Sequence, residues 1–70
     1  MPPNAAITVN DEPHPWREGL TVADVLRERN YVFPLLVVSV DGVHVPRDAY
    51  ARTPVPAGAV VVATHLVSGG

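Results

Sequence analysis

The sequence predicts an α+β domain, in which a mixed sheet in the order β-β-α-β-β-β packs on one short helix. The chain has 70 residues, which is the size of one domain. Valine is its commonest residue, and valine favours strands. A single segment has the spacing of an amphipathic helix, and strand-like runs lie on both sides of it. One sheet covered by one helix is the simplest way to bury these apolar faces.

The first two strands are expected to form a hairpin before the helix. Residues 6–10 alternate between apolar and polar side chains, as a half-buried strand does. Residues 10–12 (Asn-Asp-Glu) predict a turn. A second strand is then expected at residues 14–18. Because Pro13 and Pro15 cannot donate a backbone hydrogen bond, this strand is expected at an edge of the sheet.

The helix is predicted over residues 22–29. Thr21 is a favourable N-cap, and Asp24 lies three residues further on, as in a capping box. Asn30 is suited to ending the helix. One face of the helix is apolar and is formed by Val22, Val25 and Leu26.

The second half of the chain predicts three more strands. Residues 35–40 are strongly β-prone, and Asp41-Gly42 is a two-residue hairpin signal. Residues 43–45 form the returning strand. Residues 46–58 contain three prolines and are expected to be mostly loop. The last strand is predicted over residues 59–67.

The sequence therefore divides into a domain over residues 1–67 and a flexible tail over residues 68–70, Ser68-Gly69-Gly70. Glycine has no Cβ, so Gly69 and Gly70 leave the backbone thin and flexible. Such a tail can enter a narrow channel and present its α-carboxylate to another enzyme, where adenylation by ATP would supply a leaving group. A terminal Gly-Gly can also be a frayed chain end.

Composition and motifs argue against several other functions. The net charge of −2 does not suit a nucleic-acid-binding protein. There is no signal-peptide pattern and no apolar run long enough to span a membrane, so we expect a cytoplasmic protein. His14, His44 and His65 are too widely spaced to predict a metal site. The sequence contains no recognisable catalytic set, which indicates a protein that is not an enzyme.

Several short motifs, taken together, resemble those of the ThiS family of sulfur carriers. They are Val9-Asn10-Asp11-Glu12, Leu20 to Leu26 (LTVADVL), Val38 to Gly42 (VSVDG), Val45 to Ala51 (VPRDAYA) and the terminal Ser68-Gly69-Gly70. The resemblance extends over nearly the whole chain. Asp11 and Asp41 depart from the glycine and asparagine usual at these turns, although aspartate also suits turns.

The resemblance implies a ubiquitin-like β-grasp fold and a carrier function. An E1-like enzyme of the ThiF/MoeB type would adenylate Gly70 with ATP and magnesium, and Gly70 would then become a thiocarboxylate. The carrier itself would bind no cofactor, and its sulfur would pass to a thiazole synthase-like enzyme of thiamin biosynthesis. Related carriers serve molybdopterin synthesis or tRNA thiolation, and a ubiquitin-like modifier would use the same terminus. The fold alone does not separate these functions.

Strand alternation predicts an apolar surface for partner binding. One helix can cover only one face of the sheet, and family members often have acidic residues where Ala59 and Val62 stand. The outward face is therefore expected to be apolar, and such patches often bind partners. Its residues would dock the activating enzyme or an identical chain, unless loops bury some of them; they are Leu35, Val37, Val60, Val62 and Leu66.

Overall fold

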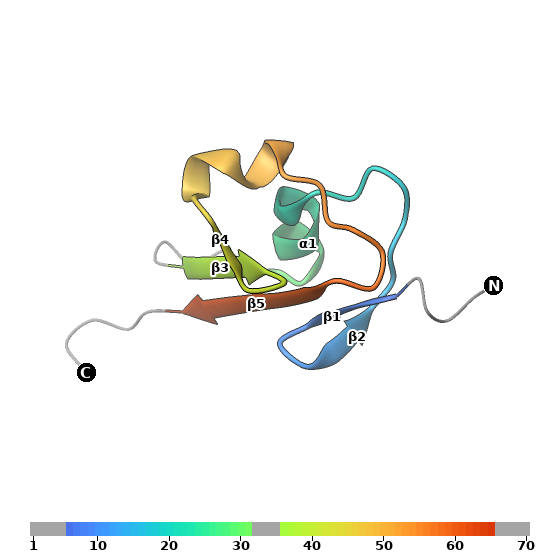
Figure 1. The fold of residues 1–70 in the computed structure, drawn as a ribbon. Coiled ribbons are helices and arrows are strands. Elements are labelled where there is room, and N and C mark those ends of the chain that lie inside the picture. Colours follow the sequence, from blue (N-terminus) through green and yellow to red (C-terminus); the bar gives the residue numbers. More distant parts are fainter. Residues whose placement is uncertain (1–5, 32–35, 66–70) are drawn as a thin grey trace.

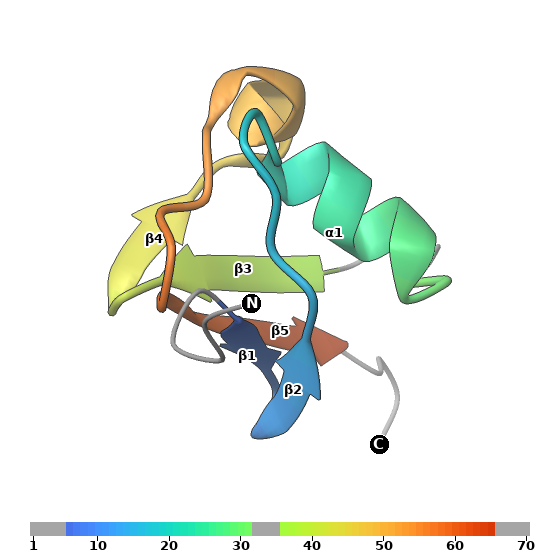
Figure 2. The ribbon, with the colours of Figure 1, turned by 90° about the vertical axis from the view of Figure 1, so that its right-hand side faces the viewer.

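A five-stranded sheet with one α-helix across one face forms the fold (Figures 1 and 2). The structure is a computed structural model that describes residues 6–31 and 36–65. Its elements are β1 (Ile7–Val9), β2 (Glu12–His14), α1 (Val22–Glu28), β3 (Leu36–Val40), β4 (Val43–Val45), a 3₁₀ helix (Arg47–Arg52) and β5 (Val60–His65). The predicted α+β class and element order are confirmed.

The last strand in the sequence lies at the centre of the sheet. The strand order is β2-β1-β5-β3-β4. Each hairpin is antiparallel, β5 runs antiparallel to β3, and β5 runs parallel to β1. The sheet is therefore mixed, as predicted, and β5 joins its two hairpins.

Both hairpins turn through two residues in the left-handed backbone region. In the first turn, φ is 51° at Asn10 and 68° at Asp11. In the second turn, φ is 51° at Asp41 and 83° at Gly42. Asparagine, aspartate and glycine adopt this region more readily than other residues, and such turns match the twist of the paired strands.

The helix begins as the sequence predicts and ends one residue earlier. Thr21 Oγ1 accepts a hydrogen bond from the backbone N–H of Asp24 at 3.2 Å, and Asp24 Oδ2 accepts one from the N–H of Thr21 at 3.1 Å. These two bonds form the expected capping box. The helix ends at Glu28, Arg29 is its C-cap, and Asn30 follows with φ of 62°.

The core lies between α1 and the facing side of the sheet, and the predicted alternation is confirmed. In β5, Val61 and Ala63 are buried, whereas Val60 and Val62 are exposed. Val38 and Val40 of β3 are buried on the same side. The largest fully buried side chains are Ile7, Val9, Leu20, Val22, Val25, Val38 and Val61.

Two local predictions are wrong. The second strand is Glu12–His14 and not residues 14–18, because the turn uses only two residues and pairing starts directly after it. Pro13 is accommodated because β2 is an edge strand, as predicted from its prolines. The expected loop at residues 46–58 contains the 3₁₀ helix, whose Ala49 is buried against the core. The last strand is predicted to reach residue 67, but residues 66–70 lie outside the described residues.

Candidate functional site: the central strand and its open face

The predicted acceptor Gly70, and with it Ser68 and Gly69, lies outside the described residues. The strand that precedes them, β5, is described as far as His65. The geometry around β5 therefore shows how the domain holds the strand that leads toward the tail.

The two neighbours of β5 pair with it over different lengths. On one side, β3 pairs with β5 from Val40↔Val61 to Leu36↔His65. On the other side, β1 pairs with β5 only at Thr8↔Val60 and Val9↔Val61. Beyond Val61, the β1 side of β5 faces the first turn instead of a strand.

The side chain of Asn10 continues the pairing on that side. Its Oδ1 accepts a hydrogen bond from the backbone N–H of Ala63 at 2.8 Å. Its Nδ2 donates to the backbone oxygen of Ala63 at 3.0 Å and lies 3.4 Å from the hydroxyl of Tyr31. One amide therefore binds both polar backbone groups of Ala63, and we call this the Asn10–Ala63 contact.

The sheet face opposite α1 carries apolar side chains. In Figure 1, α1 and the 3₁₀ helix lie on one side of the sheet. In the described parts of the chain no helix covers the other side, which we call the open sheet face. It exposes Val37 (41%), Val60 (47%) and Val62 (42%). These three residues face outward as predicted, and the other two predicted members, Leu35 and Leu66, lie outside the described residues.

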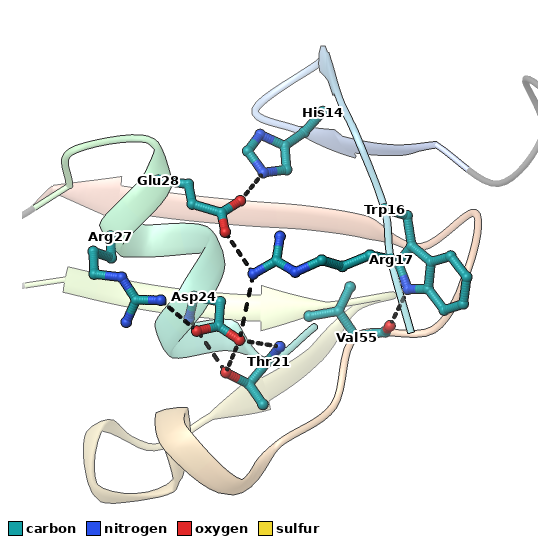
Figure 3. A network of polar contacts seen from close by, with 8 residues as sticks. All are labelled: His14, Trp16, Arg17, Thr21, Asp24, Arg27, Glu28 and Val55. Atoms are coloured by element: carbon teal, nitrogen blue, oxygen red, sulfur yellow. Dashed lines mark hydrogen bonds and ion pairs between the residues drawn. The ribbon is translucent and has the colours of Figure 1, made fainter. Parts of the chain in front are cut away.

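On the helix side, a polar cluster connects β2 with α1 (Figure 3). His14 Nε2 lies 2.9 Å from Glu28 Oε1, and Arg17 Nη2 lies 2.7 Å from Glu28 Oε2. The hydrogen bond from Arg17, and next the one from His14, lowers the pKa of Glu28. The ring of His14 is therefore buried in the structure and has Glu28 as its polar partner.

A second set of contacts in this cluster stabilises the start of the helix. The backbone N–H of Thr21, and next the side chain of Arg27, lowers the pKa of Asp24. Arg27 Nη2 lies 2.7 Å from Asp24 Oδ1. Within residues 6–31 and 36–65, no group of three or more potential ligands is placed to hold a metal ion. We assign the cluster a structural role.

Trp16 closes the core beside this cluster. Its Nε1 donates to the backbone oxygen of Val55 at 2.6 Å, and its ring packs against the core (Figure 3). Residues 53–55 lie along the start of α1. Val22 N–H donates to Thr53 O at 3.0 Å, and Val55 N–H donates to Leu20 O at 2.8 Å. Trp16 is thus partly buried and packs against the core.

A mixed sheet with a parallel central pair and a helix connecting two hairpins defines a β-grasp protein. The structure is similar to the crystal structure of a thiamine biosynthesis protein, ThiS, from Geobacter metallireducens. The TM-score is 0.75 at 25% sequence identity, over 93% of this chain and 99% of the other. The model of the ThiS family matches residues 4–70, and the chain belongs to this family.

No curated protein matches the sequence. No helix in the described residues is long and apolar enough to cross a membrane.

The sequence identifies the family and the outward valines, but not the Asn10–Ala63 contact. Asparagine at the start of a turn predicts a left-handed backbone, and this prediction needs only local residues. The partner of its side chain is 53 positions away. Only the parallel pairing of β1 with β5 brings the two residues together.

Proposed function

We propose that this chain is a sulfur carrier whose C-terminal Gly70 is adenylated and then converted to a thiocarboxylate, with thiamin thiazole synthesis as the destination of the sulfur. The observation that carries the proposal is the family match, which extends to residue 70 and so includes Ser68-Gly69-Gly70. The similar structure of a thiamine biosynthesis protein supports the choice of pathway.

The chemistry requires little from the carrier beyond an accessible carboxylate. A carboxylate oxygen of Gly70 would attack the α-phosphorus of ATP, and pyrophosphate would leave. Sulfide, or another sulfur nucleophile, would then attack the acyl carbon and displace AMP, which leaves a thiocarboxylate. ATP and magnesium would belong to the activating enzyme, where the cation neutralises charge on the phosphates. The chain itself acts as a co-substrate and not as a catalyst.

Two partners follow from this proposal. An E1-like enzyme of the ThiF/MoeB type would bind the carrier and adenylate its tail, and a thiazole synthase-like enzyme would accept the sulfur, both in the cytoplasm. We propose that the open sheet face docks the activating enzyme. The proposal is supported by exposed apolar side chains on this face, those of Val37, Val60 and Val62. Two of them belong to β5, the strand that leads toward the tail.

The test is an intact-mass measurement on the purified chain. The chain is incubated with a ThiF-type enzyme from the same organism, ATP, magnesium and sulfide. We expect a mass gain equal to the difference between one sulfur and one oxygen atom. A chain that lacks Gly70 should keep its melting temperature and show no gain, because a free terminus adds little to packing.

Three outcomes would contradict the proposal. A wild-type chain that releases no pyrophosphate with an enzyme active on its own carrier would exclude adenylation. A mass gain in the chain that lacks Gly70 would assign the acceptor elsewhere. Transfer of the adenylated chain to a protein amine, without formation of a thiocarboxylate, would identify a ubiquitin-like modifier instead.

A further inference from the structure

Each hairpin turn uses its first residue to hold β5. Asp41 donates its backbone N–H to Val60 O at 2.8 Å, and its Oδ1 accepts from Val60 N–H at 2.9 Å. Asn10 donates its backbone N–H to Val61 O at 2.9 Å and binds Ala63 through its side chain. The two residues share φ of 51°, but Asp41 holds the start of β5 and Asn10 holds the part that leads to the tail.

The amide of Asn10 takes the place of a strand residue. Thr8 N–H donates to Ala59 O at 3.1 Å, and Asn10 N–H donates to Val61 O at 2.9 Å, which is the regular spacing of a parallel pair. The next bonds in this series are made by the side-chain amide, at Ala63. A carboxamide has one acceptor and a donor group, as a peptide unit has, whereas an ionised carboxylate lacks the donor. Pairing on the β1 side thus continues for two more residues after the chain of β1 has turned away.

We propose that Asn10 is a positioning residue for the activation of Gly70, because the Asn10–Ala63 contact holds the β1 side of the part of β5 that leads toward the tail. This inference rests on the proposed carrier function. Five residues follow His65, and an extended chain spans at most about 3.3–3.6 Å per residue. Gly70 can therefore lie no farther than about 18 Å from the end of β5.

Because the tail is short, the position of the strand before it affects how the tail enters a partner. When a tail enters a channel in a partner, each additional residue that must be ordered weakens binding by roughly tenfold. Release of Ala63 on the β1 side leaves this part of β5 paired with β3 alone, so it is less firmly ordered before the encounter. Asn10 touches none of the reacting atoms in this proposal, so its loss acts on the KM for the carrier and leaves kcat unchanged.

The test compares Asn10→Gly with Asp41→Gly. Glycine adopts positive φ without strain, so each variant removes one side-chain contact with β5 and keeps its turn. Amide hydrogen exchange, measured by NMR, should show faster exchange at Ala63 in Asn10→Gly and at Val60 in Asp41→Gly. Pyrophosphate release with a ThiF-type enzyme and ATP should show a KM for the carrier raised about tenfold in Asn10→Gly, with kcat unchanged. Asp41→Gly should keep the wild-type KM.

Asn10→Asp provides a second variant in case Asn10→Gly does not fold. Aspartate suits the turn and can accept from Ala63 N–H, but it cannot donate to Ala63 O while ionised. Asn10→Asp should also raise the KM for the carrier. Melting temperatures of all variants separate a loss of folding from a loss of positioning.

Three results would overturn the inference. Faster exchange at Ala63 with an unchanged KM would show that the contact does not affect activation. An equal rise of KM in Asn10→Gly and Asp41→Gly would indicate a general loss of stability. Unchanged exchange at Ala63 in Asn10→Gly would show that other contacts hold the strand. If instead the wild-type chain releases no pyrophosphate, the proposed function fails, and this inference fails with it.

Discussion

At the scale of single residues, Glu28 connects two parts of the chain that are distant in sequence. Its carboxylate contacts the buried ring of His14 on β2 and the guanidinium of Arg17, while its backbone belongs to α1. Burial of a histidine ring is favourable only when its polar atoms find partners, and Glu28 supplies one. This contact holds the first hairpin against the helix.

We expect Glu28→Gln to lower the stability at neutral pH and to flatten its dependence on pH. Arg17 and then His14 lower the pKa of Glu28 below its ordinary value of 4.5 in the folded protein. The ionised form is therefore favoured by folding, and its stabilising effect is fully present above pH 4.5 and lost as the pH falls through the lowered pKa. Urea unfolding at several pH values should show the two proteins converging in acid.

The control for this prediction is Glu18→Gln, which removes the same charge at an exposed position outside the cluster. It should leave the free energy of unfolding at neutral pH near that of the wild type. If the free energies of unfolding of Glu28→Gln and the wild type differ by the same amount at all pH values, Glu28 contributes through packing alone.

Single residues were predictable where their partners are local. Thr21 and Asp24 cap a helix that begins next to them, and Asp41-Gly42 forms a turn from its own backbone preferences. The burial of His14 against Glu28 was not predictable, because it depends on how β2 lies against α1. The same holds for the contact of Asn10 with Ala63.

At the scale of elements, α1 is too short to be stable alone. It has seven residues, and isolated helices of this length are not stable in water. Its stability comes from the capping box and from burial of Val22, Val25 and Leu26. The helix therefore forms together with the sheet on which it packs.

We expect Thr21→Ala to destabilise the protein by about 1 kcal/mol, since it removes the side-chain oxygen that accepts from Asp24 N–H. Urea unfolding should show a lower midpoint with an unchanged slope. Thr21→Ser keeps the hydroxyl and should remain within a few tenths of a kcal/mol of the wild type. An equal loss in both variants would indicate that the methyl group of Thr21, and not its oxygen, is responsible.

Elements were predicted best where the strand is long enough for its side chains to alternate clearly between the two faces of the sheet. Alternation assigned the faces of β3 and β5 correctly, because five or six residues leave little freedom in which side chains point inward. The bounds predicted for β2 are wrong, since this strand has three residues and offers no period from which to place it. The 3₁₀ helix has a buried Ala49 but no clear apolar spacing, so it was expected to be loop.

At the scale of the whole molecule, both helices in residues 6–31 and 36–65 lie on one side of the sheet, and no helix of these residues covers the other side. On this open sheet face, Val37, Val60 and Val62 are each exposed by more than two fifths. In a small domain the apolar residues are needed in the core, and valines outside it contribute little to stability. Val60 and Val62 lie on the central strand β5 and Val37 lies on its neighbour β3, which supports the proposed role in binding.

We expect Val62→Asp to weaken binding of the activating enzyme by about tenfold or more while the melting temperature stays near that of the wild type. A charge at Val62 would be desolvated in an apolar interface, but it stays in water in the free protein. Isothermal titration calorimetry with the ThiF-type enzyme measures the affinity.

Val43→Asp is the matched control, because Val43 is exposed by 68% in the short edge strand β4 and not on the open sheet face. It should bind as the wild type does. A large fall in melting temperature for Val62→Asp would show that Val62 belongs to the core. Equal affinities for both variants would place the docking surface elsewhere.

The position of β5 also has a consequence for how the protein folds. Without β5, the strand order leaves two separate hairpins, β2-β1 and β3-β4, with no backbone pairing between them. Contacts such as that between Asn10 and Ala63 join positions 53 residues apart, and pairs this distant form late and slow the folding of a small domain. Because β5 is the last described strand in the sequence, a ribosome must synthesise the chain through residue 65 before the sheet is complete. The strand that leads toward Gly70, the proposed acceptor, is thus also the strand that completes the sheet.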